Sequence, residues 1–269
     1  YIPHAVHGEI FKKYKDTESK EKIEALRHKI TVEASQRFKN PNKKIFFWNN
    51  RNARRKQPGT LIWWFKEWLD KVGHNNAVLL MHTDAKDPHG QDLPAIIEHL
   101  GVNDGQILLS TNKVPPEDLA LMYNAADYTI NISDAEGFGL GTLESLSCGT
   151  PIIVNMTGGL QEQVTNGKDW FGWGITPASK SVIGSLQVPY IYEDRITQTD
   201  FNKVMSKALK LPKAKYNAMS NAGMKHVKKN YNFENFEKNW VSYIDNIIEK
   251  HGSWETRTGY NKWEILEVA

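Results

Sequence analysis

Short apolar runs alternate with amphipathic stretches along the middle of the chain. The apolar runs are predicted to be buried strands, at residues 44–48, 77–82, 106–110, 128–132 and 151–155. The stretches between them are predicted to be helices, at residues 60–72, 93–102, 115–126 and 140–149. Leu61, Phe65 and Trp68, for example, share one helical face. Strands that alternate with helices predict a doubly wound, Rossmann-like α/β fold, in which a parallel sheet is covered on both faces.

The flanking regions are less regular. The first 43 residues combine an extended start with a charged stretch, for which we expect an N-terminal segment and a linker helix. Loops and short strands are predicted after Gly159, and extra C-terminal helices are predicted at 200–211, 214–230 and 232–252. The last of these helices carries Trp240, Ile244, Ile247 and Ile248 on one face, which predicts burial of that face.

Composition is ordinary for a globular protein, with 40% hydrophobic and 24% charged residues. The net charge of +3 is small for a nucleic-acid-binding protein. No apolar run approaches the roughly 20 residues that span a bilayer. The single cysteine, Cys148, excludes an internal disulfide and fits a reducing compartment. The chain begins at Tyr1 with no signal-peptide pattern, so we expect that an upstream part has been removed.

The loop after the first predicted strand is strongly basic. Arg51, Arg54, Arg55 and Lys56 lie within six positions of one another. Ligands of a doubly wound sheet bind beyond the carboxyl ends of its strands, which is where this loop begins. Arginine holds phosphate through two parallel hydrogen bonds, and lysine adds a point charge. A solvated basic turn is the alternative, but the position of the loop favours phosphate binding.

The loop after the fourth predicted strand is rich in glycine, in the stretch "SDAEGFGLGTLES" at 133–145. Its spacing is Gly-x-Gly-x-Gly, whereas a dinucleotide fingerprint requires Gly-x-Gly-x-x-Gly and an acidic residue where this chain has Asn155. A Walker A sequence is also missing, so NAD and P-loop sites are disfavoured. The amides at the start of the following helix can instead receive an anion.

Two carboxylates flank these glycines and would repel a bare phosphate. Glu136 precedes the turn, and Glu144 falls in the helix that follows it. Carboxylates accept hydrogen bonds from hydroxyl groups, so a ligand with phosphates between two polyhydroxyl groups suits the loop. A nucleotide sugar has this chemistry.

The run at 126–164 resembles the carboxyl-terminal donor-binding domain of retaining glycosyltransferases of the GT-B fold, family 4 (group 1). In that family a Glu, seven residues and a second Glu precede a strand and a Gly-Gly loop, as Glu136 and Glu144 precede Gly158 and Gly159 here. The family's Arg-x4-Lys element matches Arg51 and Lys56, and "IPHAVHGEIF" is similar to its first segment, with alanine and histidine replacing glycine and aspartate. The resemblance covers residues 1–165 well and the remainder loosely.

The resemblance implies a metal-independent glycosyltransferase that retains the anomeric configuration and takes a nucleotide diphosphate sugar as substrate, with no cofactor. Arg51 and Lys56 would stabilise the leaving diphosphate, and Glu136 would contact the donor sugar. Glu144 would hold the ribose hydroxyls. The remaining expected donor contacts are Gly137, Phe138, Gly139, Leu140, Gly141 and Thr142, with Lys113 and Val114 along the base. The expected parts are 1–43, a nucleotide-sugar-binding domain at 44–250 and a C-terminal tail at 251–269.

The resemblance also implies partners. An N-terminal domain that supplies most of the acceptor site is expected, either in the same polypeptide or as a partner chain. The acceptor is left open between a sugar, a lipid and a protein glycan, and so are the donor's base and sugar. We expect no nucleic acid, a cytoplasmic location and possible peripheral association with the membrane surface.

Three alternative functions stay open at this point. A nucleotide-sugar-binding module without catalysis and a nucleotide-sugar epimerase share the same architecture, and the basic loop "RNARRK" could bind nucleic acid, although it is a small footprint on a nearly neutral chain. The loop at 82–92 holds His82, Asp87 and His89 among other polar residues, but a polar crevice wall is favoured there over a metal site. Trp170 and Trp173 could stack on a sugar if they are exposed, although packing in the core is the default for tryptophan.

Overall fold

The computed structural model describes residues 1–253, 255–257 and 259. Its main sheet has six strands in the order β3-β2-β1-β4-β5-β6, and every neighbouring pair is parallel. The strands are β1 (Lys44–Asn49), β2 (Ala77–His82), β3 (Ile107–Ser110), β4 (Tyr128–Asn131), β5 (Ile152–Asn155) and β6 (Gly172–Ile175). The predicted doubly wound sheet is therefore confirmed, with β6 as a strand that follows the five predicted ones.

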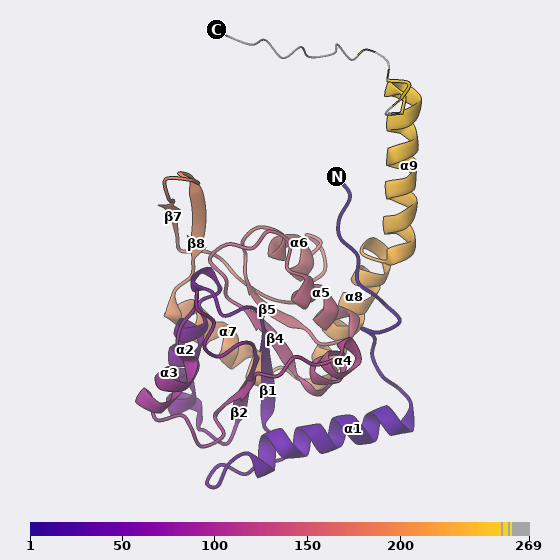
Figure 1. Cartoon of the computed structure of the whole chain (residues 1–269). Helices are drawn as coiled ribbons and strands as arrows, with labels where there is room; N and C mark the ends of the chain where they lie inside the picture. Colours follow the sequence, from indigo (N-terminus) through magenta and orange to yellow (C-terminus); the bar gives the residue numbers. More distant parts are fainter. Residues whose placement is uncertain (254, 258, 260–269) are drawn as a thin grey trace.

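Helices cover both faces of this sheet (Figure 1). In chain order they are α1 (Thr17–His28), α2 (Pro58–Val72), α3 (Leu93–His99), α4 (Pro116–Ala125), α5 (Leu140–Ser147), α6 (Leu160–Val164), α7 (Gln198–Leu209), α8 (Lys213–Asn230) and α9 (Phe233–His251). A short π-helix, η1 (Lys29–Glu33), continues α1, and a 3-10 turn, η2 (Arg54–Lys56), precedes α2. The predicted helices are thus present, with ends that differ by a few residues.

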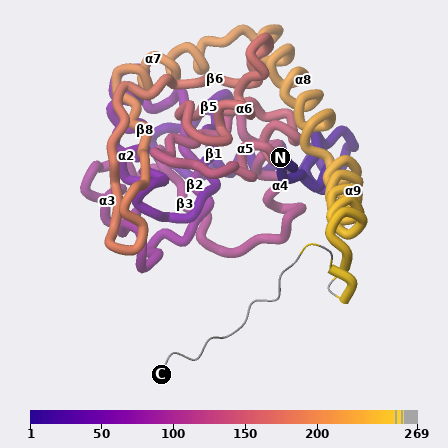
Figure 2. Tube along the Cα trace, turned by 90° about the horizontal axis from the view of Figure 1, so that it is seen from above, coloured from indigo at the N-terminus to yellow at the C-terminus, as the bar shows by residue number. Residues whose placement is uncertain are grey.

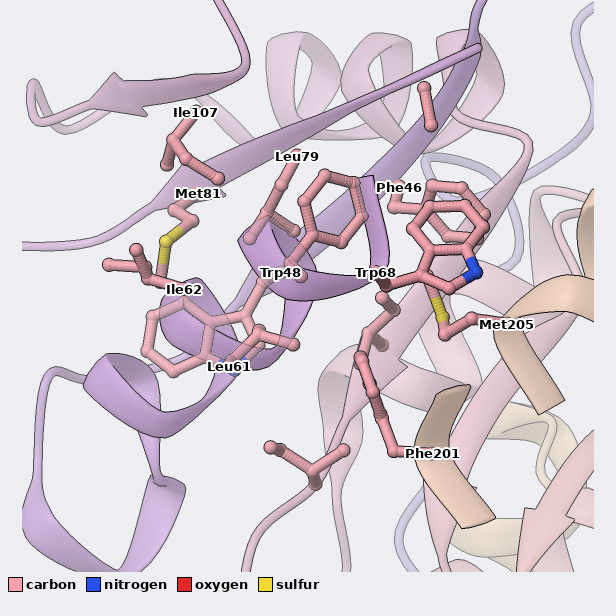
Figure 3. Packing of buried hydrophobic residues seen from close by; sticks show 14 of the residues in the cluster. Phe46, Trp48, Leu61, Ile62, Trp68, Leu79, Met81, Ile107, Phe201 and Met205 are labelled. Carbon is pink, nitrogen blue, oxygen red and sulfur yellow. The ribbon is translucent and has the colours of Figure 1, made fainter. Parts of the chain in front are cut away.

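Alternate residues of the strands divide the core in two. Phe46 and Trp48 of β1 point to the face covered by α2, α3 and α7, where Trp68 and Phe201 pack against them (Figure 3). Phe47 belongs to the opposite cluster, which α4, α5 and α8 cover. Both faces of β1 are apolar because both are buried, and each fully buried aromatic or aliphatic side chain stabilises the fold by roughly 1.5–3 kcal/mol.

The N-terminal segment packs onto the second cluster through Val6 and Phe11, and Val6 forms a β-bridge with Asn232. The predicted boundaries at 43/44 and 250/251 stay predictions, and most of the predicted tail lies outside the described residues. Within the described part of the chain, no helix has the length and hydropathy of a membrane span.

Helix α9 departs from the expectation of burial. It extends beyond the body of the molecule in both views (Figures 1 and 2), and none of its residues is buried. The predicted apolar face, from Trp240 to Ile248, is between 40% and 48% exposed at its four named positions. An amphipathic stripe predicts which side of a helix is apolar, and the structure leaves this side of α9 nearly half exposed.

A second, two-stranded antiparallel sheet follows β6. It consists of β7 (Ser179–Ile183) and β8 (Ile191–Arg195), with Ser179 opposite Arg195 and Ile183 opposite Ile191. Figure 1 shows this hairpin standing clear of the helices and the main sheet. At its base, Asp194 N–H donates to the carbonyl of Asp134 (2.7 Å), just beyond the carboxyl end of β4.

Candidate functional site at the carboxyl ends of β1 and β4

The strand order reverses between β1 and β4, so the loops that follow them diverge at this point and leave a crevice. The structure has a cavity of about 80 Å³ there. Its walls come from the ends of β1 and β4, η2 and the glycine-rich loop. The lining residues are Asn49, Asn50, Lys56, Thr129, Asn131, Glu136, Gly139, Leu140, Gly141 and Thr142. A cavity of this size admits part of a ligand as large as a nucleotide sugar.

Lys56 and Glu136 form an ion pair inside this cavity. Both side chains are about 9% exposed, so the pair is shielded from solvent. Burial lowers the pKa of Lys56, and the hydrogen bond to Glu136 acts against that shift. Arg55 lies 3.7 Å from the same carboxylate and donates to the carbonyl of Ala135 (2.6 Å). The ion pairs of Lys56 and Arg55 with Glu136 therefore link the basic loop to the glycine-rich loop.

The backbone around Lys56 is constrained as well. Gln57, the residue that precedes α2, has φ of 55°, a left-handed conformation that is costly for a residue other than glycine. Its side-chain Nε2 donates to Asp134 Oδ2 (2.5 Å), and its side-chain Oε1 accepts from the hydroxyl of Thr60 (2.6 Å). These two hydrogen bonds hold the strained turn that follows Lys56.

The glycine-rich loop leads directly into α5. Gly139 has φ of 89° and caps the helix without a side-chain hydrogen bond, so the first amides of α5 have no capping side chain. Thr142 Oγ1 donates to the carbonyl of Gly139 (2.7 Å), which tightens the turn. Positive φ explains the need for glycine at position 139. A helix start of this kind, opening on the cavity, can receive an anion.

The Gly-Gly loop after β5 packs directly against the glycine-rich loop. A Cβ atom at Gly158 would overlap the carbonyl oxygen of Glu136, and φ at Gly158 is 47°. A Cβ at Gly159 would lie 2.7 Å from the carbonyl oxygen of Phe138. These two glycines are required so that the backbones of the two loops can touch.

Glu144 lies behind the cavity at the end of a hydrogen-bond chain. Asn49 Nδ2 donates to the hydroxyl of Tyr123 (2.9 Å), and that hydroxyl donates to Glu144 Oε2 (2.9 Å). Tyr123 is fully buried, and burial raises the pKa of its phenol. Burial also raises the pKa of Glu144, while the bond from Tyr123 acts to lower it. The cavity is thereby coupled through Asn49 to the second predicted carboxylate.

Arg51 is not among the cavity-lining residues. It is exposed and pairs with Asp87, with 2.7 Å between Nε and Oδ2, and its Nη2 lies 3.2 Å from His89 Nδ1. The guanidinium holds the pKa of Asp87 at about 2. Asp87 and His89 both belong to the loop at 82–92, the candidate metal site of the sequence analysis. Among the described residues, no three His, Cys, Asp or Glu side chains are arranged as metal ligands.

The structure therefore brings only some of the predicted residues together. Lys56, Glu136, Gly139, Leu140, Gly141 and Thr142 line the cavity. Arg51, Lys113, Val114, Gly137, Phe138 and Glu144 do not line it. Phe138 instead packs edge-on against His4, at 4.9 Å between ring centroids. Lys113 is exposed in the loop after the edge strand β3. All of their functional roles stay predictions.

Four lining residues were not predicted: Asn49, Asn50, Thr129 and Asn131. Asn131 is buried, and its Nδ2 lies 3.4 Å from Glu136 Oε2. The available signal was the appearance of amide side chains at the carboxyl ends of two apolar strands. Of the two tryptophans considered for stacking, Trp170 is exposed, whereas Trp173 is partly buried and packs against the core.

The chain belongs to the family of glycosyl transferases group 1, whose model matches residues 29–226. It is 32% identical over 128 residues to D-inositol 3-phosphate glycosyltransferase from Corynebacterium jeikeium, a match over 46% of this chain and 30% of that protein. It is 40% identical over 68 residues to alpha-monoglucosyldiacylglycerol synthase from Streptococcus pneumoniae, a match over 25% of this chain and 15% of that protein.

Solved structures confirm the GT-B, Rossmann-like fold. Sucrose-phosphate synthase from Thermosynechococcus elongatus superposes with a TM-score of 0.68 at 18% identity, over 93% of this chain and 52% of that one. HepE from Anabaena, in complex with UDP and glucose, superposes with a TM-score of 0.66 at 14% identity, over 90% of this chain and 55% of that one. The chain thus spans about half the length of these glycosyltransferase structures.

Proposed function

We propose that this chain is the carboxyl-terminal, donor-binding half of a family 4 GT-B glycosyltransferase. It binds a nucleoside diphosphate sugar and transfers the sugar with retention of configuration and without a metal. Membership of the group 1 family supports the proposal, and so does a relative of the same fold that was crystallised with UDP-glucose. The observation that carries it is the cavity in which the buried Lys56, the carboxylate of Glu136 and the start of α5 meet.

The chemistry follows from the charges in that cavity. The diphosphate would lie at the start of α5, where amides without a capping side chain and the helix dipole favour an anion. Lys56 would turn from Glu136 to the phosphate as negative charge develops on the leaving group. Glu136, thereby released, would accept hydrogen bonds from sugar hydroxyls. One buried ion pair would thus supply both the cation for the phosphate and the acceptor for the sugar.

Glu144 is proposed to hold the ribose, which requires a small rearrangement. Its Oε2 now accepts from Tyr123, so a ribose hydroxyl would use the remaining oxygen or displace the phenol. Arg51 is proposed to reach the diphosphate after leaving Asp87. An N-terminal domain with the acceptor site, a cytoplasmic location and a sugar, lipid or protein-glycan acceptor remain part of the proposal.

The test is a thermal-shift measurement on this chain with UDP, GDP and ADP, followed by their glucose and mannose esters. A ligand at about 100 times its Kd stabilises the folded state by about 2.7 kcal/mol, which raises Tm by roughly 5–10 °C. Lys56→Met is the matched control and should lose most of the shift. If none of these ligands changes Tm, the donor-binding proposal is wrong.

Two further measurements separate the alternatives. Release of free sugar or its transfer to an added acceptor supports a transferase, whereas binding without any consumption of donor favours a binding module. An NMR spectrum of the nucleotide sugar after incubation without acceptor detects an epimerase, because only that enzyme would return an altered nucleotide sugar.

A further inference from the structure

The tip of the β7–β8 hairpin has an unusual surface. The twelve residues at 181–192, here called the hairpin tip, contain no charged side chain. Seven of its residues are large and apolar or aromatic, and six of these are exposed: Val182, Leu186, Val188, Tyr190, Ile191 and Tyr192. Leu186 is 98% exposed and Tyr190 is 76% exposed. Exposed apolar groups gathered on one projecting element indicate a surface that is covered in its working state.

The shape of the hairpin tip limits what can cover it. Val182 faces Tyr192 across the two strands, and the next pair, Ile183 and Ile191, points to the opposite side of the ribbon. Apolar groups therefore lie on both faces of a two-stranded ribbon, which is marginally stable in water by itself. A flat protein surface would cover one face only, whereas a hydrocarbon phase would cover both.

The charges at the base of the hairpin are arranged with the cations outward. Glu193 is 1% exposed and receives hydrogen bonds from Arg54 (3.1 Å) and Arg195 (3.2 Å), both of which are exposed. Lys180 is exposed and lies 3.5 Å from Asp194, a carboxylate that also accepts from Thr157. The acids thus face the protein and the basic groups face solvent.

From these features we propose that the hairpin tip inserts into the interfacial region of an anionic lipid bilayer. Strands rise about 3.4 Å per residue, so the Val182–Tyr192 pair lies roughly 14 Å along the ribbon from Leu186 at the turn. Interfacial segments bury their apolar groups by about 5–10 Å. Lys180 and Arg195 lie roughly 20 Å or more from Leu186 along the ribbon, so their long side chains then reach toward the headgroups from the solvent side, where cations are attracted. Tyrosine side chains such as Tyr192 favour the same interface.

The base of the hairpin is fixed to the candidate site. Asn155, at the end of β5, donates to the carbonyl of Asp194 (2.7 Å), and Arg54 belongs to the basic loop next to Lys56. A bilayer that receives the hairpin tip would therefore hold the cavity at a set distance from the lipid surface. If the proposed function holds, the acceptor is lipid-linked; this last step rests on that function, whereas insertion of the hairpin tip does not.

Helix α9 also carries exposed apolar side chains, and it provides an internal comparison. Its apolar face is flanked by Glu234, Glu237, Asp245 and Glu249 against Lys238 and Lys250 in the same helix. The excess of acids would repel an anionic bilayer. We therefore assign the lipid contact to the hairpin and not to α9, and the experiment below uses α9 as a control.

The experiment places a fluorescent reporter on the hairpin tip. Gln187→Cys offers an exposed thiol for an environment-sensitive dye, because Cys148 is buried and is the single native cysteine. On vesicles of phosphatidylcholine with phosphatidylglycerol, the dye's emission should shift to the blue. Leu186→Ser with Tyr190→Ser should lower the partition coefficient roughly tenfold or more, because the two side chains are 98% and 76% exposed in the free protein and would be buried on insertion. Lys180→Gln with Arg195→Gln should weaken binding to the anionic vesicles and leave weak binding to pure phosphatidylcholine unchanged.

Several results would overturn the proposal. It is wrong if the dye shows no shift with anionic vesicles, or if the serine variant binds them as well as the parent chain. It is also wrong if Ile244→Ser on α9 abolishes binding while the serine variant of the tip does not. A blue shift that grows with protein concentration without vesicles, together with a doubled mass in light scattering, would show that a second copy covers the tip. Donor binding, measured separately by thermal shift, reports on the proposed function and not on insertion.

Discussion

Lys56 and Glu136 lie eighty positions apart in the sequence and form a buried ion pair at the junction of β1 and β4. Each residue begins in a different loop, so the pair ties together the two segments that surround the cavity. A buried pair of this kind contributes little net stability compared with apolar residues, but it becomes costly when one partner is removed. Its charges are therefore available to a ligand that can replace both partners.

The first prediction concerns the removal of one member of this pair. Lys56→Met leaves Glu136 as an unpaired buried carboxylate and should lower the free energy of unfolding by roughly 3–5 kcal/mol. The double variant, Lys56→Met with Glu136→Gln, removes both charges and should recover most of that loss without recovering donor binding. Urea unfolding and thermal shift measure the two effects. Equal stability of the single and double variants would contradict the assignment.

The second prediction concerns the competition between Asp87 and the donor for Arg51. Asp87→Asn releases the guanidinium and should tighten donor binding severalfold, whereas Arg51→Gln should slow transfer. The double variant should behave like Arg51→Gln, because Asp87 acts through Arg51. Titration calorimetry with the best nucleoside diphosphate provides the affinities. Tighter binding in the double variant as well would show that Asp87 repels the donor directly.

The pair between Asp87 and Arg51 also has a defined pH range. The pKa of Asp87 is about 2 in the folded protein, below its ordinary value of 3.8. A depressed carboxylate pKa contributes stability that is present above the unfolded value and is lost as the pH falls toward 2. Acid unfolding of Asp87→Asn should therefore be less steep between about pH 4 and pH 2 than that of the parent chain.

The third prediction concerns Glu144, whose pKa burial raises above the ordinary value of 4.5. Its ionised form is disfavoured in the folded state, so it lowers stability at neutral pH, and this cost disappears as the pH falls through the folded pKa to below 4.5. Glu144→Gln keeps an acceptor for Tyr123 and should raise Tm at pH 7 but not at pH 4. Donor affinity should fall roughly tenfold at pH 7, as expected when a charged hydrogen-bond acceptor is lost. A variant with unchanged affinity would exclude the ribose role.

The fourth prediction tests the contact between the two glycine loops. Gly158→Ala places a Cβ against the carbonyl of Glu136 at positive φ and should cost roughly 2–4 kcal/mol of stability. Gly137→Ala is the matched control, because a Cβ there meets no atom within 4 Å and φ is not positive. Its Tm should change little. If the two variants lose equal stability, the proposed steric contact is not the cause.

Much of the architecture could be predicted because strands that are buried on both faces of the sheet are apolar at consecutive positions. The run "KIFFW" must fill two cores at once, so it is apolar at every position after Lys44, and its strand character is unambiguous. Helix α2 is buried on one side only, so its sequence shows an apolar stripe, and Trp63 outside that stripe is exposed. The same stripe on α9 indicated its apolar side correctly but could not reveal that this side stays exposed in the folded chain.

The site was less predictable because its geometry depends on contacts between distant residues. A motif placed Lys56 and Glu136 in adjoining loops, yet nothing local indicated that they pair with each other. Arg51 matched the same motif, but Asp87 holds its side chain, and that contact depends on how the loop after β2 folds back. Tyr123 was predicted only as part of a helix, since a buried tyrosine looks the same in a sequence whether its hydroxyl is used or not.

The hydrogen-bond chain from Asn49 to Glu144 has a direction that chemistry dictates. An ionised carboxylate can only accept, so the single O–H of Tyr123 must point toward Glu144, and the tyrosine oxygen must then receive its hydrogen bond from the amide nitrogen of Asn49. The amide oxygen and the second N–H of Asn49 are consequently left for other partners. A carboxylate outside the cavity wall thereby fixes the orientation of an amide whose residue lines the cavity.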